Sequence, residues 1–393
     1  MLAVSKFAIG LMTGTSIDGI DAALIEVVER SRLSFPEIKV ANTLSVPFNS
    51  SQRNQILDVC SPDASVFAMG RVHVQLGQWL GDAVNQLIGA AGIPRESIAV
   101  IGMHGQTVAH YPSSESEIPG FTIQIGDAAT LAARTGIGVV SQFRAMDMAF
   151  GGQGAPLVPY FDYAVLHSHE QDRVSLNIGG VANITVLSQG NELEDVMGFD
   201  TGPGNMVLDG MMELVTNGTA KYDKDGGLAG AGRANSKLVE TWMTHPFFHR
   251  NPPKSTGREE FGRDYCRCLY QQMKSVSLDP ADMLATVTDF VAESIAHGIQ
   301  QVQAKPFVLI AAGGGIHNTT LMNNLARKLN LVNRWSSSDV FGIPSDFKEA
   351  IAFAYFAWQF LKGRPTNLPK VTGASQRVLQ GMWTPAQKTG NAL

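Results

Sequence analysis

Residues 7–27 read FAIGLM-TGTSIDG-IDAALIEV, an apolar run, a turn of small and polar residues, and a second apolar run. Short apolar runs that flank such a turn are typical of antiparallel strands, so this stretch predicts a β-hairpin. The same design returns at residues 174–187, where VSLNI and VANITVL flank Gly179-Gly180. One such hairpin in each half of the chain suggests two domains of shared architecture, although the two copies have few residues in common.

The rest of the chain alternates predicted helices and strands. Apolar residues spaced three and four apart predict helices over residues 69–90 and 281–303. Short apolar runs predict buried strands over residues 97–102 and 307–312, and residues 244–262 are expected to form a loop punctuated by Pro and Gly. This alternation predicts an α/β protein with mixed sheets, and 393 residues are enough for two domains.

Composition and charge argue against several classes of protein. The net charge is −5 and Lys and Arg do not cluster, so no nucleic-acid partner is expected. The three cysteines match no zinc motif, and their odd number argues against a disulfide framework, so a reducing cytoplasm fits best. Residues 7–12 run straight into a glycine-rich turn, which predicts a strand and not a secretory signal. The longest apolar stretch, residues 350–361, is shorter than the roughly 20 residues that cross a bilayer, so a buried helix and no membrane association are expected.

The first hairpin turn has the chemistry of a phosphate site. Its small residues expose backbone N–H groups, and Thr15 and Ser16 add hydroxyl donors that can cradle phosphate oxygens. Asp18 and Asp21 can hold Mg²⁺ directly or through water, because this hard cation prefers oxygen ligands. A plain hairpin turn uses the same residue types. The chain has neither a P-loop nor a G-x-G-x-x-G after a strand, so a phosphate site here must be built from hairpins.

Two further glycine segments suit a nucleotide. Gly179 and Gly180 leave room for phosphates in the second hairpin, and Asn183 can donate an amide hydrogen bond. The triplet 313–315 follows a buried strand, at the kind of strand end where open α/β sheets bind ligands, and it suits the flat face of an adenosine. An ordinary β-turn and a flexible loop are the alternatives for these two segments.

Asp200 is the candidate general base. It lies in the segment GFDTGPGN, residues 198–205, where glycines and a proline form a rigid frame that can hold one carboxylate toward a cleft. The alternative is a structural aspartate that caps the following helix.

Four other residues are candidate substrate contacts. Arg144 and Asp147 precede the glycine-rich segment 150–156, and an arginine there can bind a substrate carboxylate through two hydrogen bonds, although a surface ion pair is an alternative. His104 can hydrogen-bond a sugar, or it can be a buried histidine with its partners in the chain. Glu349 lies on the first turn of the last helix, where the helix dipole alone also favours an acid.

Taken together, these segments resemble the anhydro-N-acetylmuramic acid kinase family. The matching motifs occur in order over residues 7 to about 360, and no candidate catalytic position departs from the family pattern. Each motif is weak alone, but the ordered set is specific. They are GTSIDGID at 14–21, HGQT at 104–107, QIGD at 124–127, FR at 143–144, GGQGAPLVP at 151–159, NIGGVANIT at 177–185, GFDTGPGN at 198–205 and PSDFKEA at 344–350.

The resemblance implies an α/β fold of the actin-like ATPase (ribonuclease H-like) type, shared with acetate and sugar kinases and heat-shock chaperone ATPases. In that fold two related domains with mixed sheets close over ATP in a central cleft. We therefore predict a domain I of residues 1–140 plus 345–393 and a domain II of residues 141–344. The family commonly forms dimers, which makes a homodimer the expected assembly.

The resemblance also implies a reaction. ATP and Mg²⁺ would convert 1,6-anhydro-N-acetylmuramic acid to N-acetylmuramic acid 6-phosphate and ADP, in bacterial peptidoglycan recycling, and Asp200 would take a proton from the water that opens the anhydro ring. Residues expected to bind ATP are Gly14, Thr15, Ser16, Ile17, Asp18, Gly19, Ile20, Asp21, Gly179, Gly180, Asn183, Gly313 and Gly314, with Asp18 and Asp21 at the metal. Residues expected to contact the amino sugar are His104, Arg144, Asp147, Thr201, Gly202 and Glu349.

Two alternatives stay open from the sequence. The same fold can phosphorylate a different sugar, because the glycine-rich hairpins indicate a nucleotide more clearly than any residue indicates muramic acid. The chain can also be an ATP-gated clamp of the heat-shock chaperone type that binds a protein partner, although the rigid frame around Asp200 argues against this.

Overall fold

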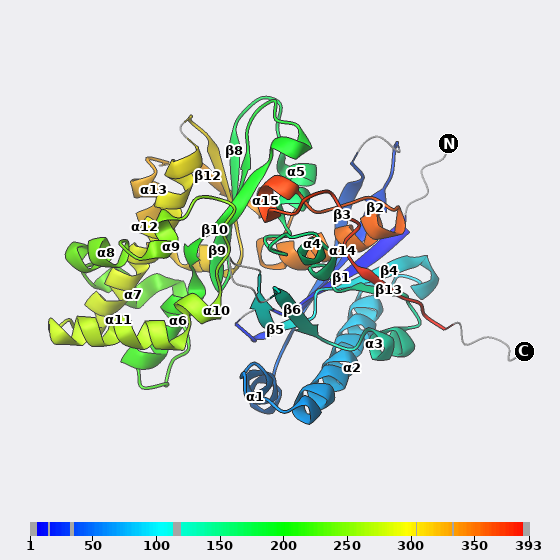
Figure 1. The fold of residues 1–393 in the computed structure, drawn as a ribbon, viewed down its shortest axis with the longest axis horizontal. Coiled ribbons are helices and arrows are strands. Elements are labelled where there is room, and N and C mark those ends of the chain that lie inside the picture. The colour runs from blue at the N-terminus through cyan, green and yellow to red at the C-terminus, as the bar shows by residue number, and fades with distance from the viewer. Residues whose placement is uncertain are drawn as a thin grey trace, which may run out of the picture. The chain divides into compact units, whose positions relative to one another are not determined.

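The computed structural model describes residues 6–14, 16–31, 35–112, 119–303, 305–331 and 334–387. The chain forms two compact units (Figure 1). Unit 1 comprises Met1–Val165 and Phe347–Leu393, and unit 2 comprises Leu166–Asp346.

Unit 1 is built on a sheet of six strands with the order β13-β7-β4-β1-β2-β3, and a separate two-stranded sheet pairs β5 with β6. Its strands are β1 (Lys6–Met12), β2 (Gly19–Val28), β3 (Glu37–Pro47), β4 (Ile98–Met103), β5 (Gln106–Tyr111), β6 (Phe121–Ile125), β7 (Val139–Ser141) and β13 (Met382–Thr384). Its helices are α1 (Ser50–Val59), α2 (Val66–Ala91), α3 (Ala128–Thr135), α4 (Ala145–Ala149), α5 (Pro159–Leu166), α14 (Lys348–Leu361) and α15 (Pro369–Thr372).

Unit 2 is built on a sheet of five strands with the order β10-β9-β8-β11-β12. Its strands are β8 (Arg173–Ile178), β9 (Val181–Leu187), β10 (Met197–Pro203), β11 (Val308–Ala312) and β12 (Trp335–Ser337). Its helices are α6 (Asn205–Val215), α7 (Gly227–Ala231), α8 (Ser236–Trp242), α9 (Pro246–His249), α10 (Arg258–Phe261), α11 (Arg263–Ser275), α12 (Pro280–Val302) and α13 (Thr319–Lys328).

Five strands of the unit 1 sheet, all except the edge strand β13, have the same topology as the five strands of the unit 2 sheet. In unit 1 the first three strands form an antiparallel meander, and β4 and then β7 add in parallel beside β1. In unit 2 the antiparallel meander is β8-β9-β10, and β11 and then β12 add in parallel beside β8. A parallel strand needs a crossover connection, which α2 supplies before β4 and α12 before β11. Both predicted hairpins are therefore confirmed, as is the α/β fold with mixed sheets in two related domains.

Helix α14 lies directly on the sheet of unit 1, because two strand glycines leave room for its backbone. A methyl group on Gly10 of β1 would overlap the carbonyl oxygen of Ala350, and one on Gly102 of β4 would overlap that of Phe353. The side chains of this helix are largely buried, as predicted for its apolar sequence. Among the described residues no helix is long and apolar enough to cross a membrane.

The predicted first domain boundary, between residues 140 and 141, is corrected by the structure. Residues 141–165 belong to unit 1 because they bond to its C-terminal segment: the N–H of Gln153 donates to Thr372 O (2.7 Å), and the N–H of Ser375 donates to Phe150 O (2.9 Å). The second predicted boundary, between 344 and 345, lies two residues from the observed one. The predicted loop 244–262 contains two one-turn helices, α9 and α10.

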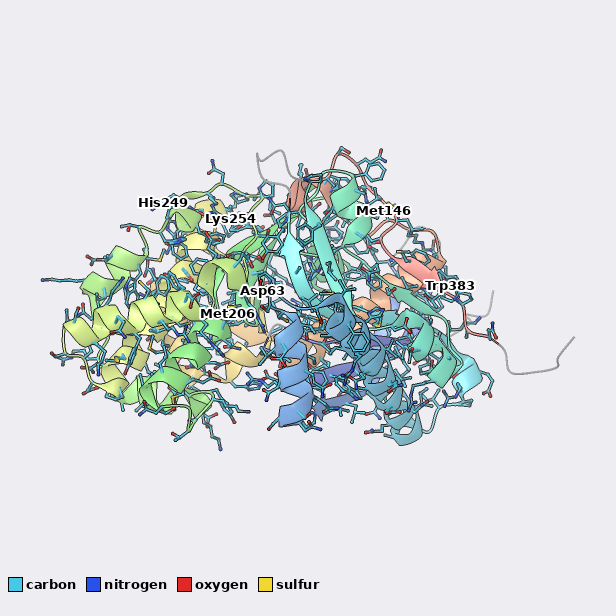
Figure 2. The ribbon with its side chains drawn as sticks, turned by 60° about the horizontal axis from the view of Figure 1, so that its bottom comes forward. Asp63, Met146, Met206, His249, Lys254 and Trp383 are labelled. Atoms are coloured by element: carbon cyan, nitrogen blue, oxygen red, sulfur yellow. The ribbon has the colours of Figure 1, made fainter. Side chains whose placement is uncertain are left out.

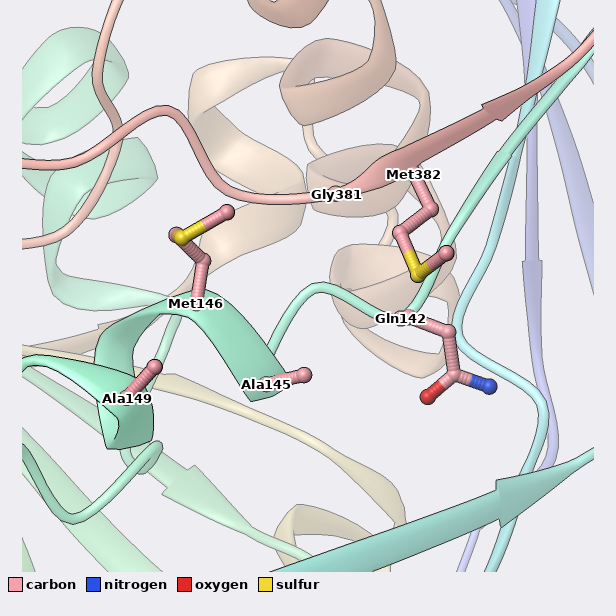
Figure 3. Close-up of a pocket in the computed structure, with 6 residues that line it drawn as sticks. All are labelled: Gln142, Ala145, Met146, Ala149, Gly381 and Met382. Carbon is pink, nitrogen blue, oxygen red and sulfur yellow. The ribbon is translucent and has the colours of Figure 1, made fainter.

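A small apolar cavity of about 230 Å³ lies elsewhere in unit 1 (Figure 3). The side chains of Met146 from α4 and Met382 from β13 line it. None of the predicted site residues is in its lining, so it belongs to the packing around β13 and not to the candidate site.

Candidate active site

The turn between β1 and β2 holds a strained residue. Ile17 has φ 56°, and its N–H donates to Gly14 O at 3.2 Å. The left-handed region is unfavourable for a β-branched residue, and it is kept here because the Ile17 side chain is fully buried in the core of unit 1. Retained strain of this kind concentrates at ligand sites. Thr15, a predicted phosphate contact, lies outside the described residues.

The two aspartates of this turn differ in exposure. Asp18 is exposed, whereas Asp21 is half-buried on β2 opposite Met12. In the described part of the chain, no group of three or more His, Cys, Asp or Glu side chains is placed to hold a metal ion. Asp18 and Asp21 suit a cation that takes one or two carboxylates and completes its shell with water and phosphate oxygens, as Mg²⁺ does.

In unit 1 the buried His104 is paired with the half-buried Arg144. The Nε2 atom of His104 accepts hydrogen bonds from Arg144 Nε (3.2 Å) and Nη2 (2.9 Å). Because arginine only donates, the proton of His104 must lie on Nδ1, which donates to Gly105 O at 2.7 Å. Burial lowers the pKa of His104 well below its usual value, and the Arg144 charge lowers it further. A neutral His104 therefore orients the guanidinium, whose Nη1 also donates to Gly154 O (2.7 Å).

Glu349 belongs to the same electrostatic neighbourhood. It lies half-buried on the first turn of α14. Burial raises the pKa of its carboxyl, the charges of Arg144 and Lys348 oppose that rise, and Asp21 reinforces it. The fold of unit 1 therefore brings together residues that are widely separated in the sequence.

Asp147 has a different setting from the one predicted. Its side chain has no exposed surface; Oδ2 accepts from the N–H of Gly154 (2.8 Å), and Oδ1 accepts from Asn367 Nδ2 (2.9 Å) and Thr372 Oγ1 (2.7 Å). This burial argues against the predicted sugar contact and the alternative surface ion pair. Asp147 instead supports the segment whose Gly154 carbonyl holds Arg144.

In unit 2 the second hairpin, the start of α6 and the glycine triplet form one cluster. The carbonyl oxygens of Gly179 and Gly180 accept the N–H groups of Asn205 (2.8 Å) and Gly204 (2.9 Å). Gly313 has φ 85°, and a Cβ there would lie 2.7 Å from Ile178 O, so only glycine fits. The triplet continues into a tight 3₁₀ turn at Gly314–His317 rather than the alternative flexible loop.

A row of polar residues crosses the sheet beside this cluster. Asn177 on β8 lies opposite Asn183 on β9, and Asn183 lies opposite Asp200 on β10. Residues directly opposite one another in antiparallel strands point to the same face, so the three side chains form one row. Asn177 is buried and, among the described residues, its Oδ1 has no hydrogen-bond partner, which marks it as a group suited to a ligand. Sequence reasoning missed Asn177, although a polar residue near the end of an apolar strand, next to the glycine turn, was a usable signal.

Asp200 is 7% exposed. It is held by the loop 244–262, to which the sequence assigned no function. Its N–H donates to Lys254 O (3.1 Å), and its Oδ2 accepts from the N–H of Thr256 (2.9 Å). The pairing of β10 with β9 shifts register between Asp200 and Gly202, and this bulge changes the direction of β10. The alternative that Asp200 caps the next helix is wrong, because Gly204 occupies the N-cap of α6.

The neighbours of Asp200 support the strand rather than open onto a site. Thr201 is buried, and its Oγ1 donates to Ala182 O at 3.1 Å. Gly202 has φ 145°, and a Cβ there would lie 2.9 Å from the ring of Phe248. Both positions therefore argue against the predicted sugar contacts and for a role in shaping the bulge that follows Asp200.

Comparison with known proteins gives consistent relatives. The family described as Anhydro-N-acetylmuramic acid kinase matches residues 6–386. The chain is 38% identical to the anhydro-N-acetylmuramic acid kinase of Caldanaerobacter subterraneus subsp. tengcongensis, over 96% of both chains. It is 42% identical to that of Acaryochloris marina, over 95% of this chain and 98% of the relative.

Solved structures are more distant. An activator of the 2-hydroxyisocaproyl-CoA dehydratase from Clostridium difficile with bound ADPNP aligns with a TM-score of 0.47 and 12% identity, over 91% of this chain and 96% of that one. A ROK family glucokinase from Streptomyces griseus in complex with glucose and AMPPNP aligns with a TM-score of 0.35 and 11% identity, over 90% and 99%. The family match over nearly the whole chain decides the assignment. The chain therefore belongs to the anhydro-N-acetylmuramic acid kinase family of phosphotransferases.

Proposed function

We propose that this kinase uses ATP and water to convert 1,6-anhydro-N-acetylmuramic acid to N-acetylmuramic acid 6-phosphate and ADP. The observation that carries the proposal is the setting of Asp200, a carboxylate fixed by the Thr256 N–H in a row with two asparagines. A positioned carboxylate of this kind is suited to proton abstraction.

In the proposed step Asp200 takes a proton from water, and the water oxygen bonds to the anomeric carbon. The bond from that carbon to O6 breaks, and O6 bonds to the γ-phosphorus as the bond to ADP breaks. The proton on Asp200 is then released to solvent. Proton transfer to a positioned side chain typically contributes about 10²–10⁴-fold to a rate, so Asp200 is essential in this scheme.

ATP is proposed to bind at the glycine segments predicted for it from the sequence. The turn at 14–21 offers N–H donors beside its strained Ile17, and Gly313 and Gly314 offer a surface without side chains. Asn177 joins the predicted Asn183 as an amide donor or acceptor. Asp18 and Asp21 would hold Mg²⁺, which when bound neutralises charge that develops on the phosphates.

Arg144 is proposed to bind the carboxylate of the sugar. Its guanidinium is oriented by the neutral His104 and by Gly154 O before any ligand arrives. Such an oriented fork suits a carboxylate through two parallel hydrogen bonds. Glu349 lies within the field of Arg144 and is proposed to accept from a sugar hydroxyl.

The test is the variant Asp200→Asn, with Asp264→Asn as matched control because Asp264 is a 97% exposed aspartate of the same unit. We expect Asp200→Asn to bind ATP as the wild type does and to lose at least about 10²-fold in kcat. Mass spectrometry of wild-type product formed in ¹⁸O-water should find the label at the anomeric hydroxyl. Near-normal turnover of the variant, or unlabelled product, would contradict the mechanism.

The biological setting is proposed with the reaction. We infer a role in peptidoglycan recycling in the bacterial cytoplasm, and a homodimer as the assembly, which light scattering can check. A screen of simple sugars with ADP release as readout tests the alternative acceptor. The alternative of a non-enzymatic clamp is overturned by the family assignment.

A further inference from the structure

We propose that Lys254 is a positioning residue for Asp200, with its buried ammonium group keeping that carboxylate ionised and in place. This inference rests on the proposed role of Asp200 as general base. Lys254 lies in the predicted loop 244–262, for which the sequence suggested no function (Figure 2).

The first observation is the burial of the lysine. Lys254 is 4% exposed, and lysine is almost never buried without compensation. Its Nζ lies 4.9 Å from the ring centre of Phe247 and 5.6 Å from that of Phe199, and it donates to Phe247 O at 3.4 Å. Two aromatic faces and a carbonyl oxygen stabilise a cation at this point.

The second observation is that lysine and aspartate are coupled through backbone and charge. The Asp200 N–H donates to Lys254 O (3.1 Å), and Thr256, two residues further on, donates to the Asp200 carboxylate (2.9 Å). Phe199, whose ring faces the ammonium, precedes Asp200 directly in β10. Burial lowers the pKa of Lys254, Arg250 lowers it further, and the charge of Asp200 raises it.

Other charged groups surround the pair and must be considered in any pH effect. Glu260 pairs with Arg250 (2.9 Å) and lies 4.0 Å from His245. Burial raises the pKa of Glu259, and Glu260 adds to that rise. On α12, which packs against β10, His297 Nε2 lies 3.3 Å from Phe248 O. Arg250 is paired with Glu260, whereas the charge of Asp200 raises the pKa of Lys254.

The chemical consequence follows from this arrangement. A general base works only while it is ionised, and a nearby cation favours the charged form of a carboxylate. A lysine tethered to the same loop that fixes the Asp200 backbone would supply this charge without contacting the substrate. Its loss should therefore change the pH range of catalysis more than it changes nucleotide binding.

The main test compares Lys254→Met, which keeps the length of the side chain, with Lys254→Arg, which keeps the charge. We expect Lys254→Met to shift the acidic limb of the kcat profile upward by about one pH unit, with KM for ATP changed less than about twofold. Lys254→Arg should move the limb back toward the wild-type position. Lys274→Met is the matched control, since exposed Lys274 also lies over an aromatic ring, that of Tyr270.

A reciprocal measurement covers the case in which Lys254→Met fails to fold. In the full-length protein with ¹³C-methylated lysines, Asp200→Asn should lower the pKa of Lys254, because the Asp200 charge now raises it. An unmoved kcat limb in a folded Lys254→Met protein, or an unmoved lysine pKa in Asp200→Asn, would overturn the inference. Near-normal turnover of Asp200→Asn would instead remove the proposed function itself, so the two failures are distinguishable.

Discussion

Replacing Lys348 by Met should destabilise the folded protein by about 4 kcal/mol at pH 7, because it leaves a carboxylate buried without its cation. Lys348 Nζ lies 2.7 Å from Asp162 Oδ1, and the two side chains are 1% and 3% exposed. The pair joins the two segments at which the chain leaves unit 1, after Val165, and returns to it, at Phe347.

The magnitude follows from the cost of removing one partner of a buried ion pair. Breaking a buried ion pair on one side typically costs about 3–5 kcal/mol. The middle of this range gives the expected loss of about 4 kcal/mol. Since Met preserves most of the side-chain volume, packing losses should add little.

The assay is urea unfolding at pH 7, monitored by circular dichroism and by tryptophan fluorescence. The double variant Asp162→Asn, Lys348→Met should recover most of the loss, because neither charge then remains buried. The reasoning is refuted by a loss below about 1 kcal/mol at pH 7, or by a double variant as unstable as the sum of the single ones.

Three further predictions test other parts of the structure. Burial lowers the pKa of His110 to about 3 and that of His104 well below its usual value. As the pH falls, both histidines therefore become protonated in the unfolded chain before they do in the folded protein. The free energy of unfolding should fall below about pH 6.5, by about 1.4 kcal/mol per pH unit for each histidine. For His110→Gln, a plot of unfolding free energy against pH between about 4 and 6 should have about half the wild-type slope. Gly313→Ala should weaken nucleotide binding at least about tenfold in titration calorimetry, because the added Cβ would clash with the carbonyl oxygen of Ile178. Gly190→Ala is the control for backbone strain alone, since Gly190 has φ 76° but open space around its Cβ position. Asp147→Asn should lower unfolding free energy by about 1–3 kcal/mol, since an amide NH₂ cannot accept the loop N–H; a thermal midpoint equal to wild type would contradict this.

Much of the fold could be predicted because its signals are local. Residues 7–27 and 174–187 each contain two apolar runs and a small-residue turn, and such a segment pairs with itself whatever surrounds it. The helix predicted over 281–303 corresponds to α12, which begins after the Asp279 cap and ends at Val302. The boundary at residue 140 was wrong because the bonds that place residues 141–165 reach partners more than 200 residues away.

Some residues of the candidate site could also be predicted from the sequence, and others could not. Gly313 and the aspartates at 18, 21 and 200 could be selected because their residue types and strand-end positions carry chemistry by themselves. Asp147 could not be judged from the sequence, since a carboxylate next to a glycine-rich segment looks the same whether it faces a ligand or accepts three hydrogen bonds inside the unit.

The sequence by itself determined the two hairpins, the alternation of strands and helices, and the family. Only the tertiary structure decided that Asn177, Asn183 and Asp200 share one face, that His104 orients Arg144, and that Lys254 is buried and its carbonyl oxygen accepts the backbone N–H of Asp200. The physical reason is distance along the chain. Periodicity and turn chemistry act over a few residues, whereas the charge, burial and hydrogen bonds of a site are set by segments that meet only after the chain has packed.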